Sequence, residues 1–202
     1  MRHLPLNLTR LMAASVAAIA LIATPLSAAA QAAPTPEQMQ ATRAVTGELL
    51  KTLSGKLQAS MKENGPAGSI TVCQTIAPEI ALGLADKTGW KITRVGTRVR
   101  NIDLGTPNVW QHKALGHLNA DLKSGAKPET LEWSEVVTEN GKPTLHYAKA
   151  IVLQTQCLAC HGTAAQLAPG VAGKLKANYP QDQATGYAPG QLRGAVVISR
   201  PL

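Results

Sequence analysis

Residues 131–161 read LEWSEVVTENGKPTLHYAKAIVLQTQCLACH, and this stretch decides the fold class. Asn140-Gly141 stands between two runs with the composition of strands, Leu131 to Thr138 and Pro143 to Leu153. Asn-Gly is the favoured two-residue connection of a β-hairpin because both residues tolerate a positive φ. The stretch therefore predicts an antiparallel hairpin that leads directly into Cys157-Leu158-Ala159-Cys160-His161.

The sequence on either side of this hairpin completes an α+β pattern. Thr35, Pro36 and Gln38 form a helix start with a capping box, and apolar residues then recur every four positions from Val45 to Met61. Gly65-Pro66 is the expected end of this helix. The other expected elements are a helical region over 67–87 broken at Pro78, a strand over 90–99, a loop over 101–107, a helix over 109–123, a short helix near 171–177 and a strand over 191–201. This order predicts an antiparallel sheet with long N-terminal helices packed against it.

The first 30 residues have the composition of an export signal. Arg2 and Arg10 precede an apolar run from Leu11 to Leu26, and the small residues at 28–32 suit a signal peptidase. An uncleaved membrane anchor is the alternative. We expect residues 1–30 to be a cleaved signal peptide and residues 31–202 to be a single periplasmic domain. No later run approaches the ~20 apolar residues that span a bilayer, so we expect no membrane contact after cleavage.

The chain is basic, with a formal net charge of +8, of which Arg2 and Arg10 contribute two. Excess lysine and arginine suits an anionic partner such as nucleic acid, anionic lipid or an acidic redox protein. Nucleic acid is the poorest candidate for an exported protein, so we expect no nucleic-acid partner.

Cys157 and Cys160, with His161 directly after them, form the attachment pattern of c-type haem. The two thiols can add to the two vinyl groups of one porphyrin, and the adjacent imidazole can ligate the iron from beneath the ring. The motif predicts one covalent haem c, with thioether bonds at Cys157 and Cys160 and His161 as an axial ligand.

Other sites also use cysteines at this spacing. A thioredoxin-like thiol–disulfide oxidoreductase would carry the motif early, at a helix N-terminus, whereas here it lies late and Gly162 follows it. A zinc site needs a fourth ligand group, and a Cys157–Cys160 disulfide would close a strained loop. Every methionine precedes Cys157. This excludes the architecture of a small helical cytochrome, in which a methionine downstream of the haem motif ligates the iron. A four-helix-bundle cytochrome conflicts with the predicted hairpin.

The second axial ligand remains open at this point. Cys73 is either a buried small hydrophobe or a thiolate ligand, which would favour ferric iron. The other upstream candidates are His112, His117, His146, Met39 and Met61.

Over most of residues 31–202 the chain resembles the PAS-like c-type haem domains, a family of periplasmic monohaem proteins and sensory modules. The residues that carry this resemblance are Val72-Cys73, Ala77 to Ala81, Arg94, Arg98, Arg100-Asn101, Pro107, Trp110, Tyr147, Cys157 to Gly162, Gly186-Tyr187 and Leu192 to Val196. One position departs from the family pattern, because Gly96 stands where serine or threonine is common.

The resemblance implies a PAS-like fold, one haem, and axial ligation of the iron by His161 and Cys73. It also implies a redox or small-gas sensor, with nitric oxide or carbon monoxide as ligand and a redox or signalling protein as partner. A filled coordination sphere without an acid/base pair argues against an enzyme. The alternative function is a low-potential periplasmic electron carrier.

Three arginines are candidates to contact the haem propionates. Alternate residues of a strand share a face, so Arg94, Arg98 and Arg100 would all point the same way within a strand over 90–99 and its continuation. The alternative is a solvated basic face.

Overall fold

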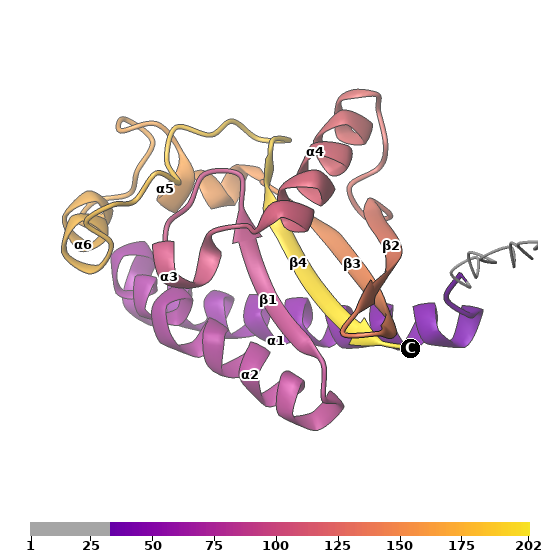
Figure 1. Cartoon of the computed structure of the whole chain (residues 1–202). Coiled ribbons are helices and arrows are strands. Elements are labelled where there is room, and N and C mark those ends of the chain that lie inside the picture. The colour runs from indigo at the N-terminus through magenta and orange to yellow at the C-terminus, as the bar shows by residue number, and fades with distance from the viewer. Residues whose placement is uncertain (1–32) are drawn as a thin grey trace, which may run out of the picture. The chain divides into compact units, whose positions relative to one another are not determined.

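A computed structural model describes residues 33–202, and the expected export signal over 1–30 lies outside the described residues. Its sheet has four antiparallel strands, β1 (Lys91–Gly96), β2 (Glu132–Glu139), β3 (Lys142–Val152) and β4 (Leu192–Pro201), in the order β1-β4-β3-β2 (Figure 1). The last strand therefore lies between the first strand and the hairpin. The α+β class with an antiparallel sheet is confirmed, whereas the PAS-like assignment stays a prediction.

The hairpin forms as expected from its turn residues. Asn140 and Gly141 both have positive φ, 51° and 76°, and Glu139 pairs with Lys142 across the turn. Asn140 is the sole non-glycine residue with positive φ in the described part of the chain. The turn geometry thus sets the register of β2 and β3.

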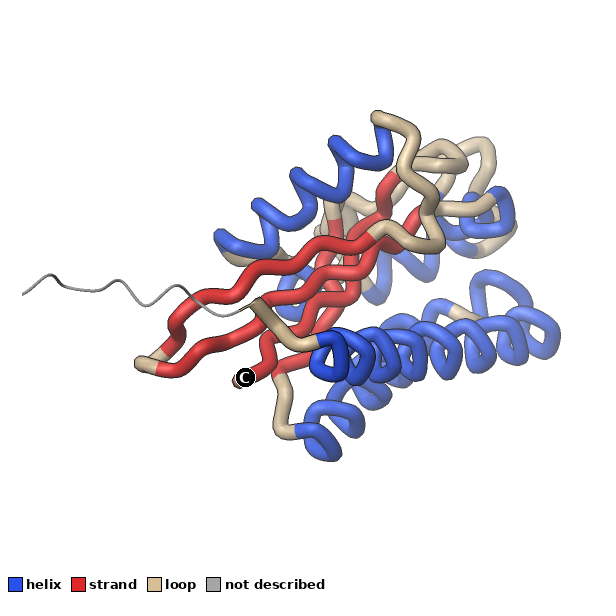
Figure 2. The backbone as a smooth tube through the Cα atoms, turned by 90° about the vertical axis from the view of Figure 1, so that its right-hand side faces the viewer, coloured by secondary structure: helices blue, strands red, loops and turns tan. Residues whose placement is uncertain are grey.

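Helices cover both faces of the sheet. The helices α1 (Pro36–Gly68) and α2 (Ala77–Thr88) pack on one face, and α4 (Val109–Lys123) packs on the other (Figure 2). Val196 and Ile198 of β4 join the core under α1 and α2, whereas Ala195 and Val197 join the core under α4. Alternate side chains of a strand point to opposite faces, so β4 is apolar on both.

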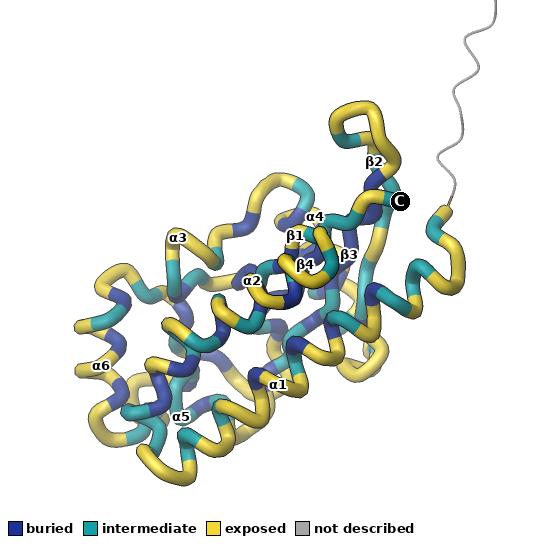
Figure 3. The backbone as a smooth tube through the Cα atoms, turned by 90° about the horizontal axis from the view of Figure 1, so that it is seen from below, coloured by how far each residue is buried: buried dark blue, intermediate teal, exposed yellow. Residues whose placement is uncertain are grey.

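The start of α1 matches the predicted capping box. Gln38 N–H donates to Thr35 Oγ1 (3.2 Å), and Thr35 N–H donates to Gln38 Oε1 (2.8 Å). Buried and exposed residues alternate along the helix (Figure 3). Its buried positions are Thr42, Thr46, Leu49 and Leu53, so two members of the predicted apolar stripe are buried, together with two threonines that precede them.

A kink and a widened turn follow α1. Gly65 has a φ of 65°, which breaks the helical geometry before Pro66, and the chain continues helically to Gly68. Residues Val72–Ile76 then form a π-helical turn, η1, in which Ala77 N–H donates to the Val72 carbonyl five residues back. Pro78, the expected break, lies in the first turn of α2, where its missing N–H is tolerated. Single-turn π segments are frequent at functional sites.

The structure corrects two expectations around the first strand. β1 ends at Gly96, so the strand is shorter than predicted, and Arg98 and Arg100 lie beyond it. The argument from alternating strand residues therefore fails for these two arginines. The expected loop over 101–107 contains a short helix, α3 (Ile102–Gly105), because Asn101 Oδ1 accepts from two backbone N–H groups and caps it.

The remaining elements follow the predicted order. A 3₁₀ turn, η2 (Thr155–Cys157), leads into the short helix α5 (Leu158–His161), and α6 (Val171–Asn178) precedes β4. Among residues 33–202, no single helix is long and apolar enough to cross a membrane, and α1 passes that test only when joined to the bent segment Val72–Thr88.

Gly194 is required by the close approach of β4 to β1. A Cβ atom at Gly194 would lie 1.9 Å from the Val95 carbonyl oxygen. We expect Gly194→Ala to lower the free energy of unfolding by about 2–3 kcal/mol, because two paired backbones must separate. Urea unfolding of the purified protein measures this effect.

The matched control for this substitution is Gly83→Ala. Gly83 lies in α2, where an added Cβ meets nothing within 4 Å. We expect a gain of about 0.5–1 kcal/mol, because alanine favours a helix interior over glycine. Equal stability of the two variants would contradict the proposed contact at Gly194.

Candidate functional site

The cysteine motif forms one compact helical turn at the end of β3. Gly162 N–H donates to the Leu158 carbonyl (2.8 Å), and Ala168 N–H donates to the Ala159 carbonyl (3.0 Å). Cys157 packs against a cluster that includes Ala184, whereas Cys160 packs against a cluster formed by Ile70, Val171, Leu175 and Tyr179. All three cysteines of the chain are free thiols.

Burial keeps Cys160 in its protonated form. It raises the pKa of the Cys160 thiol; Arg100 opposes this change, and Cys73 and Cys157 add to it.

His161 is held in a defined tautomer. Its Nδ1 lies 2.7 Å from the Ala184 carbonyl oxygen, which accepts only, so Nδ1 carries the proton. Burial, together with the nearby charges of Arg100 and Arg193, lowers the pKa of His161 to about 3, although the hydrogen bond to the Ala184 carbonyl acts in the opposite direction. The ring is therefore neutral near pH 7, and its Nε2 lone pair has no hydrogen-bond partner among residues 33–202. A metal-binding histidine has this same arrangement.

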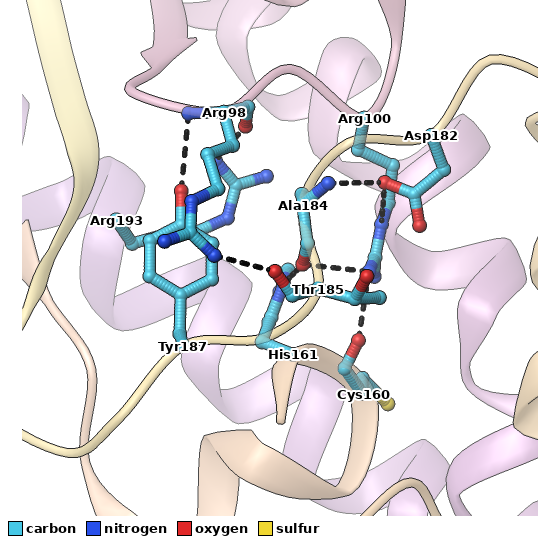
Figure 4. Close-up of polar contacts among 9 residues, drawn as sticks. All are labelled: Arg98, Arg100, Cys160, His161, Asp182, Ala184, Thr185, Tyr187 and Arg193. Atoms are coloured by element: carbon cyan, nitrogen blue, oxygen red, sulfur yellow. Dashed lines mark hydrogen bonds and ion pairs between the residues drawn. The ribbon is translucent and has the colours of Figure 1, made fainter. Parts of the chain in front are cut away.

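Arg100 connects the motif to the segment that supports His161. Its Nε donates to Asp182 Oδ1 (3.2 Å), and its Nη2 donates to the carbonyls of Cys160 (2.7 Å) and Ala184 (3.2 Å) (Figure 4). Asp182 Oδ1 also accepts from Ala184 N–H (2.8 Å). The Arg100 and Asp182 side chains are only 7% and 8% exposed. The Ala184 carbonyl thus accepts from both His161 and Arg100.

Tyr187 packs edge-on against the His161 ring. The ring centroids lie 6.2 Å apart at 85°, and Tyr187 N–H donates to the His161 carbonyl (2.9 Å). The Tyr187 hydroxyl shares a hydrogen bond with Thr97 Oγ1 (2.8 Å) and accepts from Arg98 N–H (3.1 Å). The guanidinium carbons of Arg98 and Arg193 lie 4.5 and 5.8 Å from the Tyr187 ring centroid (Figure 4).

Arg94 lies in β1, close to Cys73 and Tyr179. Burial lowers the pKa of Arg94, and both neighbours act in the opposite direction. The Arg94 side chain is half-buried, yet it forms no hydrogen bond or ion pair within the described part of the chain. Such a cation needs an anionic partner.

Cys73 lies in the π-helical turn η1. The neighbouring Gln74 Oε1 accepts from Asn178 Nδ2 (3.0 Å), which joins this turn to α6. The fold thus brings most of the predicted site residues together at one end of the sheet: Cys73, Cys157, Cys160, His161, Arg94 and Arg100. Arg98 is exposed and lies at the edge of this group.

The other candidate ligands have different surroundings. His146 stacks on Trp110 (4.2 Å between centroids), and its Nε2 lies 2.9 Å from Glu139 Oε1. His117 stacks on Trp133 (5.4 Å). These contacts tie both histidines to α4 and the hairpin. Within residues 33–202, no group of three or more His, Cys, Asp or Glu side chains is arranged to hold a metal ion.

Sequence reasoning missed two residues of this site, Asp182 and Ala184, which no local pattern marks. Tyr187 and Arg193 belong to the motifs that carry the family resemblance, but their place beside His161 was not predicted. Gly96, the departure from the family pattern, has a structural explanation. A Cβ atom there would lie 2.5 Å from Arg193 Nη1, which donates to the Arg98 carbonyl (2.9 Å).

Comparisons with known proteins give one family and one solved structure of similar fold. The model of the Tll0287-like family matches residues 24–201. One solved structure with the same fold is the crystal structure of the cyanobacterial heme-protein Tll0287, at a TM-score of 0.63 and 22% sequence identity. The match covers 83% of this chain and 96% of that chain. No curated protein sequence matches significantly.

Proposed function

The chain belongs to the Tll0287-like family, and on this premise we propose that it binds one haem c covalently. Cys157 and Cys160 would form the thioether bonds, and His161 would ligate the iron through Nε2. The observation that carries the proposal is the Nδ1 hydrogen bond of His161 to Ala184, which leaves a neutral imidazole with a free Nε2 beside two free thiols. The structural similarity to a haem protein supports it.

The cationic groups of the site also fit haem, which carries two propionates. Arg94 is a half-buried cation without a polar partner, so we propose it as the main propionate contact. Arg98 is exposed and retains donors beyond its bond to the Thr185 carbonyl, so it stays a candidate. Arg100 already has three acceptors, which makes it the least suited of the three.

Cys73 is the proposed second axial ligand. Cys73 lies close to Arg94, at the same end of the sheet as the other two cysteines. Cys73 also lies in a turn that Gln74 links to α6, and its neighbour Val72 packs with Leu53 of α1. A movement of Cys73 would therefore be transmitted to α1, α2 and α6.

We propose that the protein is a periplasmic redox or small-gas sensor, exported by a cleaved signal at residues 1–30, and not an enzyme. When bound, haem supplies an iron that changes oxidation state and binds gases such as nitric oxide or carbon monoxide. The chain's part is to hold His161 rigidly and to carry Cys73 on a turn able to move. A signalling or redox protein would receive the output.

The alternative function is a low-potential electron carrier. The observation that favours it is the buried Arg100–Asp182 ion pair, which supports the His161 segment and limits rearrangement at that ligand. Fast electron exchange with a periplasmic donor, together with no binding of nitric oxide or carbon monoxide, would favour the carrier over the sensor.

Covalent attachment is tested by periplasmic expression with the haem maturation machinery. We expect a red protein that keeps its haem stain under denaturing electrophoresis, and the double variant Cys157→Ser/Cys160→Ser should lose that stain completely. Cys73→Ser is the matched control, because it also removes a thiol from the site but should keep the stain. A wild-type protein without stain would overturn covalent attachment.

A further inference from the structure

A groove lies beside the haem site, on the α4 side of the sheet. It has a volume of about 620 Å³ and runs between α4 and the chain segments around Thr97 and Tyr187. Pockets for small molecules have volumes on the order of 300–1,000 Å³, so the groove has a suitable size. Its walls come from segments distant in the sequence.

Basic and neutral polar side chains line this groove together with Leu115, Leu122 and Leu192. Arg98 contributes from one wall, and His112, Asn119 and Lys123 contribute from α4, with no acidic residue among the lining groups. The side chains of His112, Asn119 and Lys123 make no hydrogen bond or ion pair to any described residue. Unengaged donors on a groove without acids favour an anionic ligand with several oxygen acceptors.

The groove is connected to His161 through Tyr187. Arg98 lines the groove and lies 4.5 Å from the Tyr187 ring centroid. Tyr187 in turn lies against His161 and donates its backbone N–H to the His161 carbonyl. An anion paired with Arg98 would thus place negative charge two side chains away from the proposed iron ligand.

We propose that this groove binds a small organic anion with carboxylate groups, and that its occupancy is coupled to the haem. The binding site stands on the lining residues alone, whereas the coupling rests on the proposed haem function. Bound negative charge stabilises the more positive ferric state, so the ligand lowers the midpoint potential. The redox state of the haem would then depend on whether an anion occupies the groove.

Calorimetric titration of the purified holoprotein tests binding, with succinate as the probe. We expect saturable succinate binding that Lys123→Gln weakens at least about fivefold, because this variant removes one cationic group. Lys56→Gln is the matched control: it makes the same charge change on the exposed surface of α1, and its affinity should equal that of the wild type. Succinamide, the uncharged analogue, should not bind.

Titrations with inorganic phosphate and with the control variant separate the possible outcomes. Tighter binding of inorganic phosphate than of succinate would overturn the carboxylate assignment, and no saturable binding of either would overturn the site. If Lys56→Gln and Lys123→Gln weakened succinate binding equally, the binding would reflect unspecific charge attraction, and this result would also overturn the proposed site.

Redox titration tests the coupling. Saturating succinate should lower the midpoint potential of the wild type and of Lys56→Gln, with a much smaller shift for Lys123→Gln at the same concentration. Binding without any shift overturns the coupling. A protein that binds succinate but holds no haem contradicts the proposed haem function and leaves the anion site standing, so the two failures are distinguishable.

Discussion

Replacing Cys73 by alanine is expected to change the electron paramagnetic resonance spectrum of the oxidised protein and to raise its midpoint potential by on the order of 0.1 V. A thiolate ligand donates electron density to the iron and stabilises the ferric state, and alanine removes that donor. The proposed covalent attachment of the haem should be kept, because Cys157 and Cys160 are untouched. Redox titration and low-temperature spectra of wild type and variant measure the effect.

The matched control is Thr75→Ala, on the same π-helical turn. Thr75 is exposed and its hydroxyl donates to the Thr71 carbonyl (2.9 Å), so its loss perturbs the turn without touching the thiol. Its spectrum should equal that of the wild type. An unchanged spectrum of Cys73→Ala would refute the thiolate ligand and return the histidines and methionines upstream of Cys157 to consideration.

Replacing Arg100 by methionine is expected to lower the free energy of unfolding by about 3–5 kcal/mol. The substitution leaves Asp182 as an uncompensated buried charge, and it removes the donors to the Cys160 and Ala184 carbonyls. Urea unfolding of the holoprotein, followed by circular dichroism, gives the value. The double variant Arg100→Met/Asp182→Asn should recover part of the lost free energy of unfolding, because the asparagine side chain carries no charge that needs a partner.

An exposed ion pair provides the comparison. Lys87 and Glu48 lie 3.4 Å apart with side chains 69% and 51% exposed. Lys87→Met should change stability by less than about 1 kcal/mol, because water screens this pair. If Arg100→Met were equally mild, Arg100 would not be the support of the His161 segment.

Local sequence patterns predicted much of the secondary structure. The Asn140-Gly141 turn, the capping box at Thr35 and the helix Val109–Lys123 were all predicted correctly, because each depends on residues within a few positions of one another. The Cys157 to His161 motif likewise lies within one helical turn. Such features are decided by turn geometry and backbone hydrogen bonds that close locally.

Predictions that needed the path of the chain were less successful. Arg98 and Arg100 were expected on a strand, but β1 ends at Gly96, where β4 approaches closely at Gly194. Gly65-Pro66 was expected to end the first helix, but the structure has a kink at Gly65 and the helical path continues to Gly68. Both outcomes depend on what packs against the segment.

The sequence by itself determined the α+β class, the hairpin and the site motif, because residue type and spacing decide these features. Only the tertiary structure decided that Arg100 pairs with Asp182, 82 positions away, and that Ala184 holds the tautomer of His161. It also decided that Arg94, among the three arginines proposed to contact the haem propionates, is the one without a polar partner within residues 33–202. Ion pairs and burial depend on distances through space, and these are set when β4 enters the sheet between β1 and β3.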